Sequence, residues 1–230
     1  MSMARNCDRT ITAAGRGRRA VMAAIVGVAI LASCSSHHSS ASAPTTIAPP
    51  TSASAAGPAD LRHALFDQLP ASYVEEPAGT GVDGPLALPA AAKAQSSANP
   101  SGARSQLVTL GFKRGYARGW VVTGASEFLY SYVFLFDSPH DATSYWNQIT
   151  FEYRVDPNIS TFPTGALANA ASFIVHTTAQ GVHDDYVVDL VAGPLFYRVD
   201  LGGPPGSVTP SDVLTIARSQ MVEAAALGYS

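Results

Sequence analysis

The chain has 230 residues, of which 47% are apolar and 13% are charged, and its formal net charge is −3. So low a charge content excludes a nucleic-acid-binding protein that works through a basic surface, and the 9% aromatic content excludes a chain disordered throughout. Both cysteines, Cys7 and Cys34, lie near the N-terminus, which excludes a disulfide or a thiolate metal site in the rest of the chain.

Residues 1–33 have the pattern of a secretion signal. Five arginines and one acidic residue precede an uncharged, largely apolar run over residues 20–32. As a helix these thirteen residues span about 20 Å, short of the roughly 30 Å hydrocarbon core of a bilayer. We therefore predict a cleaved signal peptide rather than a membrane-spanning helix, and Arg18-Arg19 leaves twin-arginine export open as an alternative route.

The predicted signal ends in the tetrapeptide Leu31-Ala32-Ser33-Cys34. This sequence resembles the lipobox of bacterial lipoproteins, and the resemblance covers the first 34 residues. It implies that cleavage falls before Cys34 and that Cys34 receives a diacylglyceryl group, with palmitate among its acyl chains. Because two acyl chains anchor a protein stably, the resemblance implies a lipid anchor at the extracytoplasmic face of the cell membrane. The alternative is an ordinary secreted protein with a stray cysteine.

Residues 34–58 are predicted to form the lipidated cysteine and a disordered stalk. Residues 35–58 are rich in Ser, Ala, Pro and Thr and carry no formal charge and no aromatic side chain. Such a segment cannot bury enough apolar area to offset its conformational entropy. As a random coil it would reach roughly 25–30 Å from the membrane.

Residues 59–230 are predicted to be a single extracytoplasmic domain. They hold all of the Phe, Tyr and Trp residues, and nine Lys and Arg stand against sixteen Asp and Glu. A moderately acidic surface repels nucleic acid and anionic lipid headgroups. We therefore expect no nucleic-acid partner, and membrane contact through the lipid on Cys34 alone.

The sequence of this domain alternates between helical and strand patterns. Ser138 before Pro139 and Thr209 before Pro210 mark two helix starts. The expected elements are helices 60–69, 89–96 and 104–110, strands 113–122 and 126–136, a helix from 139 to about 153, strands 170–177, 186–192 and 195–201, and a helix from 210 to 228. This order, α-α-α-β-β-α-β-β-β-α, predicts an α+β fold: an antiparallel β-sheet of about five strands with helices packed on one face.

The first predicted hairpin places large rings opposite small residues. A turn at Gly124-Ala125 sets Tyr130, Tyr132 and Phe134 against Gly119, Ala117 and Gly115 on the preceding strand. The other face of that strand then carries Tyr116, Arg118 and Trp120. Aromatic and arginine side chains outside a core are typical of binding sites, so we predict these three as ligand-binding residues. The alternative is that helix 60–69 or 104–110 covers them and makes Trp120 a core residue.

The second predicted hairpin brings two opposite charges together. A turn at Gly193-Pro194 sets Asp189 opposite Arg198. We interpret the pair as an exposed cross-strand ion pair that contributes at most about 1 kcal/mol. The alternative is a pair that orients a ligand.

Motifs that carry chemistry are weak in this sequence. The glycines between Gly79 and Gly84 match G-x-G-x-x-G but lack the strand–turn–helix context of a dinucleotide site. His183-Asp184-Asp185, with His176 nearby, has metal-ligand chemistry but is interpreted as a polar hairpin loop. We predict no catalytic residue, no metal site and no cofactor.

A Ser/Ala/Thr/Pro stalk followed by a cysteine-free α+β domain resembles uncharacterised lipoproteins of mycobacteria and their relatives. Residues 128–146 are also similar to extracellular sensor-like domains of that group, but those domains usually carry disulfide cysteines that this chain lacks. We therefore transfer no ligand and no binding residue. The favoured hypothesis is a non-enzymatic envelope lipoprotein that binds a small ligand or an envelope protein. The alternative is an envelope hydrolase that uses His176 or His183 with a nearby acid.

Overall fold

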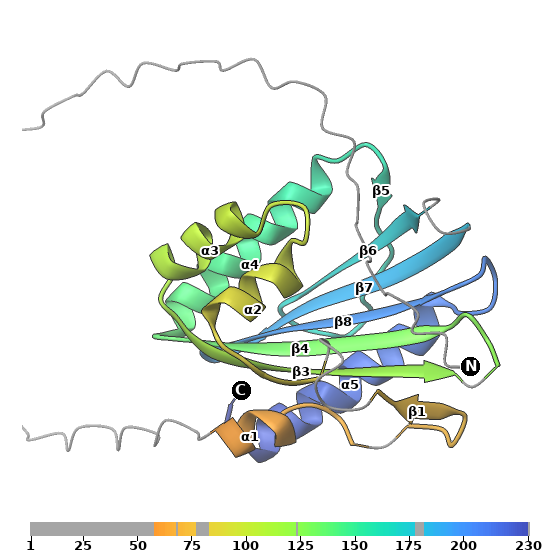
Figure 1. Ribbon diagram of the computed structural model, residues 1–230, viewed down its shortest axis with the longest axis horizontal. Coiled ribbons are helices and arrows are strands. Elements are labelled where there is room, and N and C mark those ends of the chain that lie inside the picture. Colours follow the sequence, from red (N-terminus) through yellow and green to blue (C-terminus); the bar gives the residue numbers. More distant parts are fainter. Residues whose placement is uncertain (1–57, 68, 77–82, 123, 178–181, 230) are drawn as a thin grey trace, which may run out of the picture. The chain divides into compact units, whose positions relative to one another are not determined.

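An antiparallel β-sheet lies between two layers of helices in the computed structural model (Figure 1). The structure describes residues 58–67, 69–76, 83–122, 124–177 and 182–229. The predicted signal peptide, Cys34 and the predicted stalk up to residue 57 lie outside these residues, so the proposed division of the chain stays a prediction. None of the described helices is both long and apolar enough to cross a bilayer.

The sheet has eight strands, in the order β1-β3-β4-β8-β7-β6-β5, and β2 also pairs with β3. The helices are α1 (Pro58–His63), α2 (Leu88–Gln95), α3 (Pro100–Thr109), α4 (Pro139–Arg154) and α5 (Pro210–Ala226). The strands are β1 (Tyr73–Glu75), β2 (Gly84–Leu86), β3 (Phe112–Val122), β4 (Phe128–Phe136), β5 (Ile159–Ser160), β6 (Ala170–Thr177), β7 (His183–Ala192) and β8 (Leu195–Gly203).

The predicted sheet of about five strands is wrong, because the sheet has eight. The five expected strands are all present as β3, β4, β6, β7 and β8. The additional strands β1, β2 and β5 are only two or three residues long. A segment of that length shows no alternation of apolar and polar residues, so its sequence carries no strand signal.

The expectation of helices on one face is also wrong. Helices α2, α3 and α4 cover one face of the sheet, called here the α4 face, and α1 and α5 cover the opposite α5 face (Figure 1). The central strands explain this arrangement, because they are apolar on both sides. In β4, Tyr132 and Phe134 are buried on the α4 face, and Val133 and Leu135 are buried on the α5 face. Both faces therefore need a cover.

The predicted strand registers are confirmed. Tyr130, Tyr132 and Phe134 pair with Gly119, Ala117 and Gly115, and Asp189 pairs with Arg198. A Cβ added at Gly115 would lie 2.8 Å from the Phe134 ring, so the small residue is what admits the ring.

Two helix starts follow the predicted caps, and a third was missed. Ser138 Oγ accepts a hydrogen bond from the Asp141 backbone N–H, and Thr209 forms a capping box with Asp212. α3 begins at Pro100, earlier than expected, because Asn99 acts as its cap and accepts a hydrogen bond from Gly102 N–H at 3.0 Å.

Candidate functional site

The predicted ligand-binding residues lie on a face that the chain itself covers. Trp120 is only 5% exposed and stacks on Phe66, with ring centroids 4.8 Å apart. Tyr116 is half-buried against the same core cluster. The segment Leu61–Asp67, called here the N-terminal segment, therefore occupies this face. Ligand binding by the three residues stays a prediction, and it would require this segment to move away.

Arg118 joins the N-terminal segment to the sheet. Its guanidinium donates to both Glu75 carboxylate oxygens, at 2.8 and 3.0 Å, to the Phe66 carbonyl oxygen at 2.8 Å, and to the Asp67 carboxylate. Its Cζ atom also lies 4.8 Å from the centre of the Trp120 ring. These contacts neutralise and position Arg118, so in this state it does not offer a free cation to a ligand.

The same contacts shift the pKa values of the pair. The hydrogen bonds from Arg118 lower the pKa of Glu75. Burial by itself lowers the pKa of Arg118, but hydrogen bonds to Glu75 and Asp67 oppose that effect and the net shift is upward. Both groups are therefore held in their charged forms.

Arg198 and Asp189 form a second ion pair, on the α4 face. The pairing is confirmed, but the predicted exposure is wrong, because Asp189 is 0% and Arg198 6% exposed. Two hydrogen bonds of 2.7 Å join them, and Arg198 Nη1 donates to the Tyr153 hydroxyl at 2.9 Å. Burial by itself lowers the pKa of Arg198, whereas Asp189 raises it, and the net shift is upward. The pair is part of the core and is not open to a ligand.

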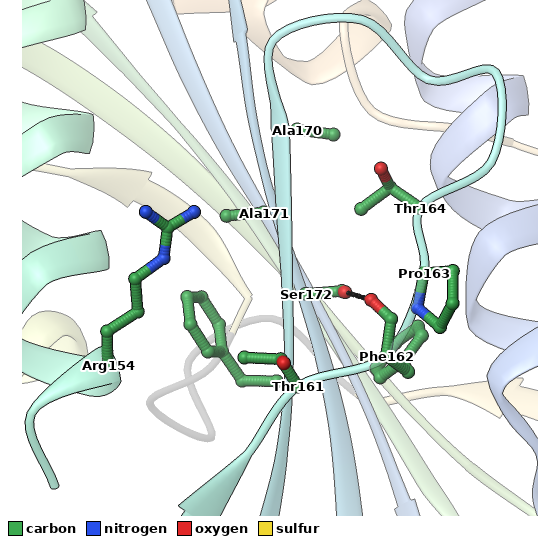
Figure 2. Close-up of a pocket in the computed structure, with 9 residues that line it drawn as sticks. Arg154, Thr161, Phe162, Pro163, Thr164, Ala170, Ala171 and Ser172 are labelled. Atoms are coloured by element: carbon green, nitrogen blue, oxygen red, sulfur yellow. Dashed lines mark hydrogen bonds between the residues drawn. The ribbon is translucent and has the colours of Figure 1, made fainter.

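A pocket of about 440 Å³ lies beside β6 (Figure 2). We call it the β6 pocket. It is lined by the end of α4, by the segment that follows β5, and by the first half of β6. Figure 2 shows Arg154 and Ala171 pointing toward one another on one side of β6, with Pro163 and Thr164 on the other side. The lining residues are Arg154, Thr161, Phe162, Pro163, Thr164, Ala170, Ala171, Ser172 and Phe173.

The polar groups of the β6 pocket include one cation and no carboxylate. Arg154 is exposed and has no hydrogen bond or ion pair to another described residue. The hydroxyl groups of Thr161 and Thr164 likewise lack a hydrogen-bond partner within the described part of the chain, whereas the Ser172 hydroxyl donates to the Phe162 carbonyl oxygen. The pocket therefore holds an unpaired positive charge and two available hydroxyl groups.

One wall of the β6 pocket is a strand edge. β6 pairs with β5 only at Val175 and Ile174, while its first residues pair with β7 alone. The Val191 N–H donates to the Asn169 carbonyl oxygen at 3.1 Å, which sets the alternation of backbone groups along β6. By this alternation the backbone N–H and C=O groups of Ala170 and Ser172 point away from β7, and Ala170 is the more exposed of the two because Ser172 is buried.

The β6 pocket was not predicted from the sequence. The pocket exists because the short strand β5 separates from β6 after Ser160, and neither the two-residue strand nor the separation has a hydrophobic pattern. The available signal was composition: Thr161–Gly165 combines two threonines, a proline and a glycine, which is typical of an irregular surface segment.

His176 and His183 lie on neighbouring strands at one end of the sheet. His183-Asp184-Asp185 belongs to β7, so the predicted polar loop is wrong for these residues. His176 Nδ1 lies 2.6 Å from an Asp184 carboxylate oxygen. No described hydroxyl hydrogen-bonds the His176 ring, and the described residues contain no group of three or more His, Cys, Asp or Glu that could hold a metal ion.

Comparisons with known proteins assign no family. No family model matches the chain, and no curated protein matches it. Among solved structures, the extracellular domain of PknH from Mycobacterium tuberculosis is similar over 74% of this chain and 97% of that chain, with 11% sequence identity and a TM-score of 0.49. A likeness at this level assigns neither a family nor a function.

Proposed function

We propose that this chain is a lipid-anchored binding protein of the cell envelope. Diacylglyceryl on Cys34 would hold it at the extracytoplasmic face of the cell membrane, and residues 35–58 would act as a stalk. The domain that follows would bind a small ligand or an envelope protein without catalysing a reaction. The observation that carries the anchoring is the tetrapeptide Leu31-Ala32-Ser33-Cys34 directly after a short apolar run.

The state of the charged residues supports binding rather than catalysis. Arg118 and Arg198 are each tied into ion pairs that hold the fold together. The β6 pocket instead offers an unpaired cation, hydroxyl groups and apolar side chains, which is the usual composition of a ligand site. None of its lining residues is a histidine, an acid or a cysteine, the usual general bases and the most reactive nucleophile.

Metabolic labelling with an alkyne analogue of palmitate tests the anchor. The full chain should take up the label and sediment with membranes. Cys34→Ala should lose both properties, and Cys7→Ala should keep both, because residue 7 would be removed with the signal peptide. Label on Cys34→Ala, or loss of label in Cys7→Ala, would refute the lipoprotein assignment.

Native mass spectrometry tests the binding role. The mature protein, purified in detergent from membranes of its native host, should carry a bound molecule or a bound envelope protein. Thr161→Trp, which replaces a lining residue of the β6 pocket by a large ring, should reduce retention of a small molecule. A mature protein that carries neither kind of partner would contradict the binding role.

One observation favours the hydrolase as a second candidate. The 2.6 Å contact between His176 Nδ1 and Asp184 is the geometry by which a carboxylate orients a catalytic histidine. Hydrolysis of p-nitrophenyl acetate by the mature protein measures this activity. If the protein is a binding module, His176→Asn and His183→Asn should hydrolyse the ester at the same rate as the unchanged protein. A rate that falls more than about tenfold in either variant would favour the hydrolase.

A further inference from the structure

We propose that the β6 pocket binds the free carboxylate end of an extended peptide. This inference rests on the proposed binding function and names the chemical class of its ligand. Three features of the pocket carry it: an unpaired guanidinium, a strand edge that has no described partner strand beside Ala170 and Ser172, and apolar walls on a rigid support.

The guanidinium belongs to Arg154 at the C-terminal end of α4. It is exposed, reaches toward Ala171 across the pocket (Figure 2), and forms no ion pair with another described residue. A guanidinium presents two parallel N–H groups that match the two oxygens of a carboxylate. Because no acidic residue lines the pocket, nothing in the lining competes for this cation.

The strand edge accounts for the peptide part of the ligand. Ala170 and Ser172 line the pocket, their backbone donors and acceptors point away from β7, and no described strand pairs with them on that side. An extended peptide satisfies such an edge with its own alternating N–H and C=O groups. A ligand without amide groups would leave these backbone groups to water.

The apolar walls limit the size and the mobility of the bound segment. Phe173 is fully buried and stacks on Tyr153 at 4.9 Å, and the Tyr153 hydroxyl accepts a hydrogen bond from Arg198. The wall formed by Phe173 is therefore connected, through Tyr153, to the buried ion pair of Arg198 and Asp189. A volume of about 440 Å³ lies within the range of small-ligand sites and suits a few residues rather than a long peptide.

The same features favour a peptide carboxylate over phosphate. A phosphate group carries more charge than a carboxylate and is usually held by several cationic groups, whereas Arg154 is the one cation among the residues that line this pocket. The carbonyl oxygens of the β6 edge also repel an anion that has no donor to offer them. A peptide places its N–H groups against those oxygens and its single negative charge at Arg154.

Calorimetric titration of the mature protein in detergent tests this assignment. The probes are N-acetyl-trialanine with a free carboxylate, the same peptide as its C-terminal amide, sodium acetate and inorganic phosphate. The acid should bind at least about tenfold more tightly than the amide, because the amide cannot form the charge-assisted pair with Arg154. Acetate and phosphate should bind more weakly than the acid, because neither can pair with the strand edge.

Two variants and a matched control locate the site. Arg154→Gln should weaken binding of the acid at least about tenfold, and Thr161→Trp should weaken binding of acid and amide alike. Arg104→Gln removes the same charge from an exposed position on α3 and should leave binding unchanged. Far-ultraviolet circular dichroism of each variant checks that it is folded.

The inference is overturned if acid and amide bind equally, if phosphate binds more tightly than the acid, or if Arg154→Gln behaves like Arg104→Gln. It is also overturned if neither peptide binds. That last result would leave the proposed function intact where the protein still takes up label at Cys34 and retains a different partner in native mass spectrometry. Failure of the label at Cys34 would refute the anchor without affecting the titration.

Discussion

Arg198 and Asp189 face each other across neighbouring strands and share two hydrogen bonds of 2.7 Å beneath α4. Removal of two opposite charges from water costs free energy, which their attraction and hydrogen bonds offset only while both partners are present. The Tyr153 hydroxyl accepts a further hydrogen bond from Arg198, and the Tyr153 ring stacks on Phe173. Because Phe173 lines the β6 pocket, the ion pair supports one wall of that pocket. Stability and the shape of the pocket are therefore coupled through this pair.

The first prediction concerns loss of one member of that pair. Asp189→Asn should lower the free energy of unfolding by about 3–5 kcal/mol, because it leaves the Arg198 charge buried without a counter-charge. The double variant Asp189→Leu/Arg198→Met should lose less than the single variant, because it leaves no charge behind. Urea denaturation followed by circular dichroism measures both. A double variant that is less stable than Asp189→Asn would contradict this account.

The second prediction concerns the N-terminal segment. Arg118→Met removes the side chain that joins Phe66, Asp67 and Glu75, so the segment should leave the α5 face and uncover Trp120. In a Trp146→Phe background, Trp120 emission should shift to the red and become quenchable by iodide. Arg104→Met provides the control, since it replaces an exposed arginine on another helix with the same residue. Unchanged emission in Arg118→Met would mean that apolar packing alone holds the segment.

The third prediction is a pH dependence of the same contact. Hydrogen bonds from Arg118 lower the pKa of Glu75 below its ordinary value of 4.5 in the folded protein. The folded state therefore binds this proton less readily than the unfolded chain. The contribution of the pair is fully present above pH 4.5 and is lost as the pH falls through the lower pKa of the folded state. Trp120 emission should shift to the red over that acidic range, and Glu75→Gln should reduce the shift. An equal shift in Glu75→Gln would assign it to other carboxylates.

Contacts between near neighbours in the sequence could be predicted, and contacts across long separations could not. The hairpin registers follow from local turns, so the positions of Tyr132 opposite Ala117 and of Asp189 opposite Arg198 were both available from the sequence. The partners of Arg118 were not, because Glu75 and Asp67 precede it by 43 and 51 residues. No periodicity relates residues so far apart, so the sequence left two alternatives for this face, an open binding surface or a surface covered by helix 60–69 or 104–110, and the structure shows the segment 61–67 covering it.

The β6 pocket could not be predicted from the sequence for a related reason. Its walls come from α4, from the segment after β5 and from β6, and only the first and last of these were expected as elements. Arg154 has no distinguishing neighbour in the sequence. Arg154 is a candidate binding residue only because the fold places it beside the edge of β6, and the sequence alone does not predict that neighbour.

The last prediction concerns Gly202, where β8 passes between β4 and β7. A Cβ at this position would lie under 3.0 Å from the Phe128 ring and from an Asp185 carboxylate oxygen, a separation that real Cβ atoms essentially never show. Gly202→Ala should therefore lower the free energy of unfolding by about 1–3 kcal/mol, because the neighbouring strands must shift to admit the methyl group. Phe128→Ala removes one of the two obstacles, so the same glycine substitution should cost less in that background. Urea denaturation of the four proteins in this double-mutant cycle gives the coupling directly, and a coupling near zero would show that the Phe128 ring is not what requires glycine there.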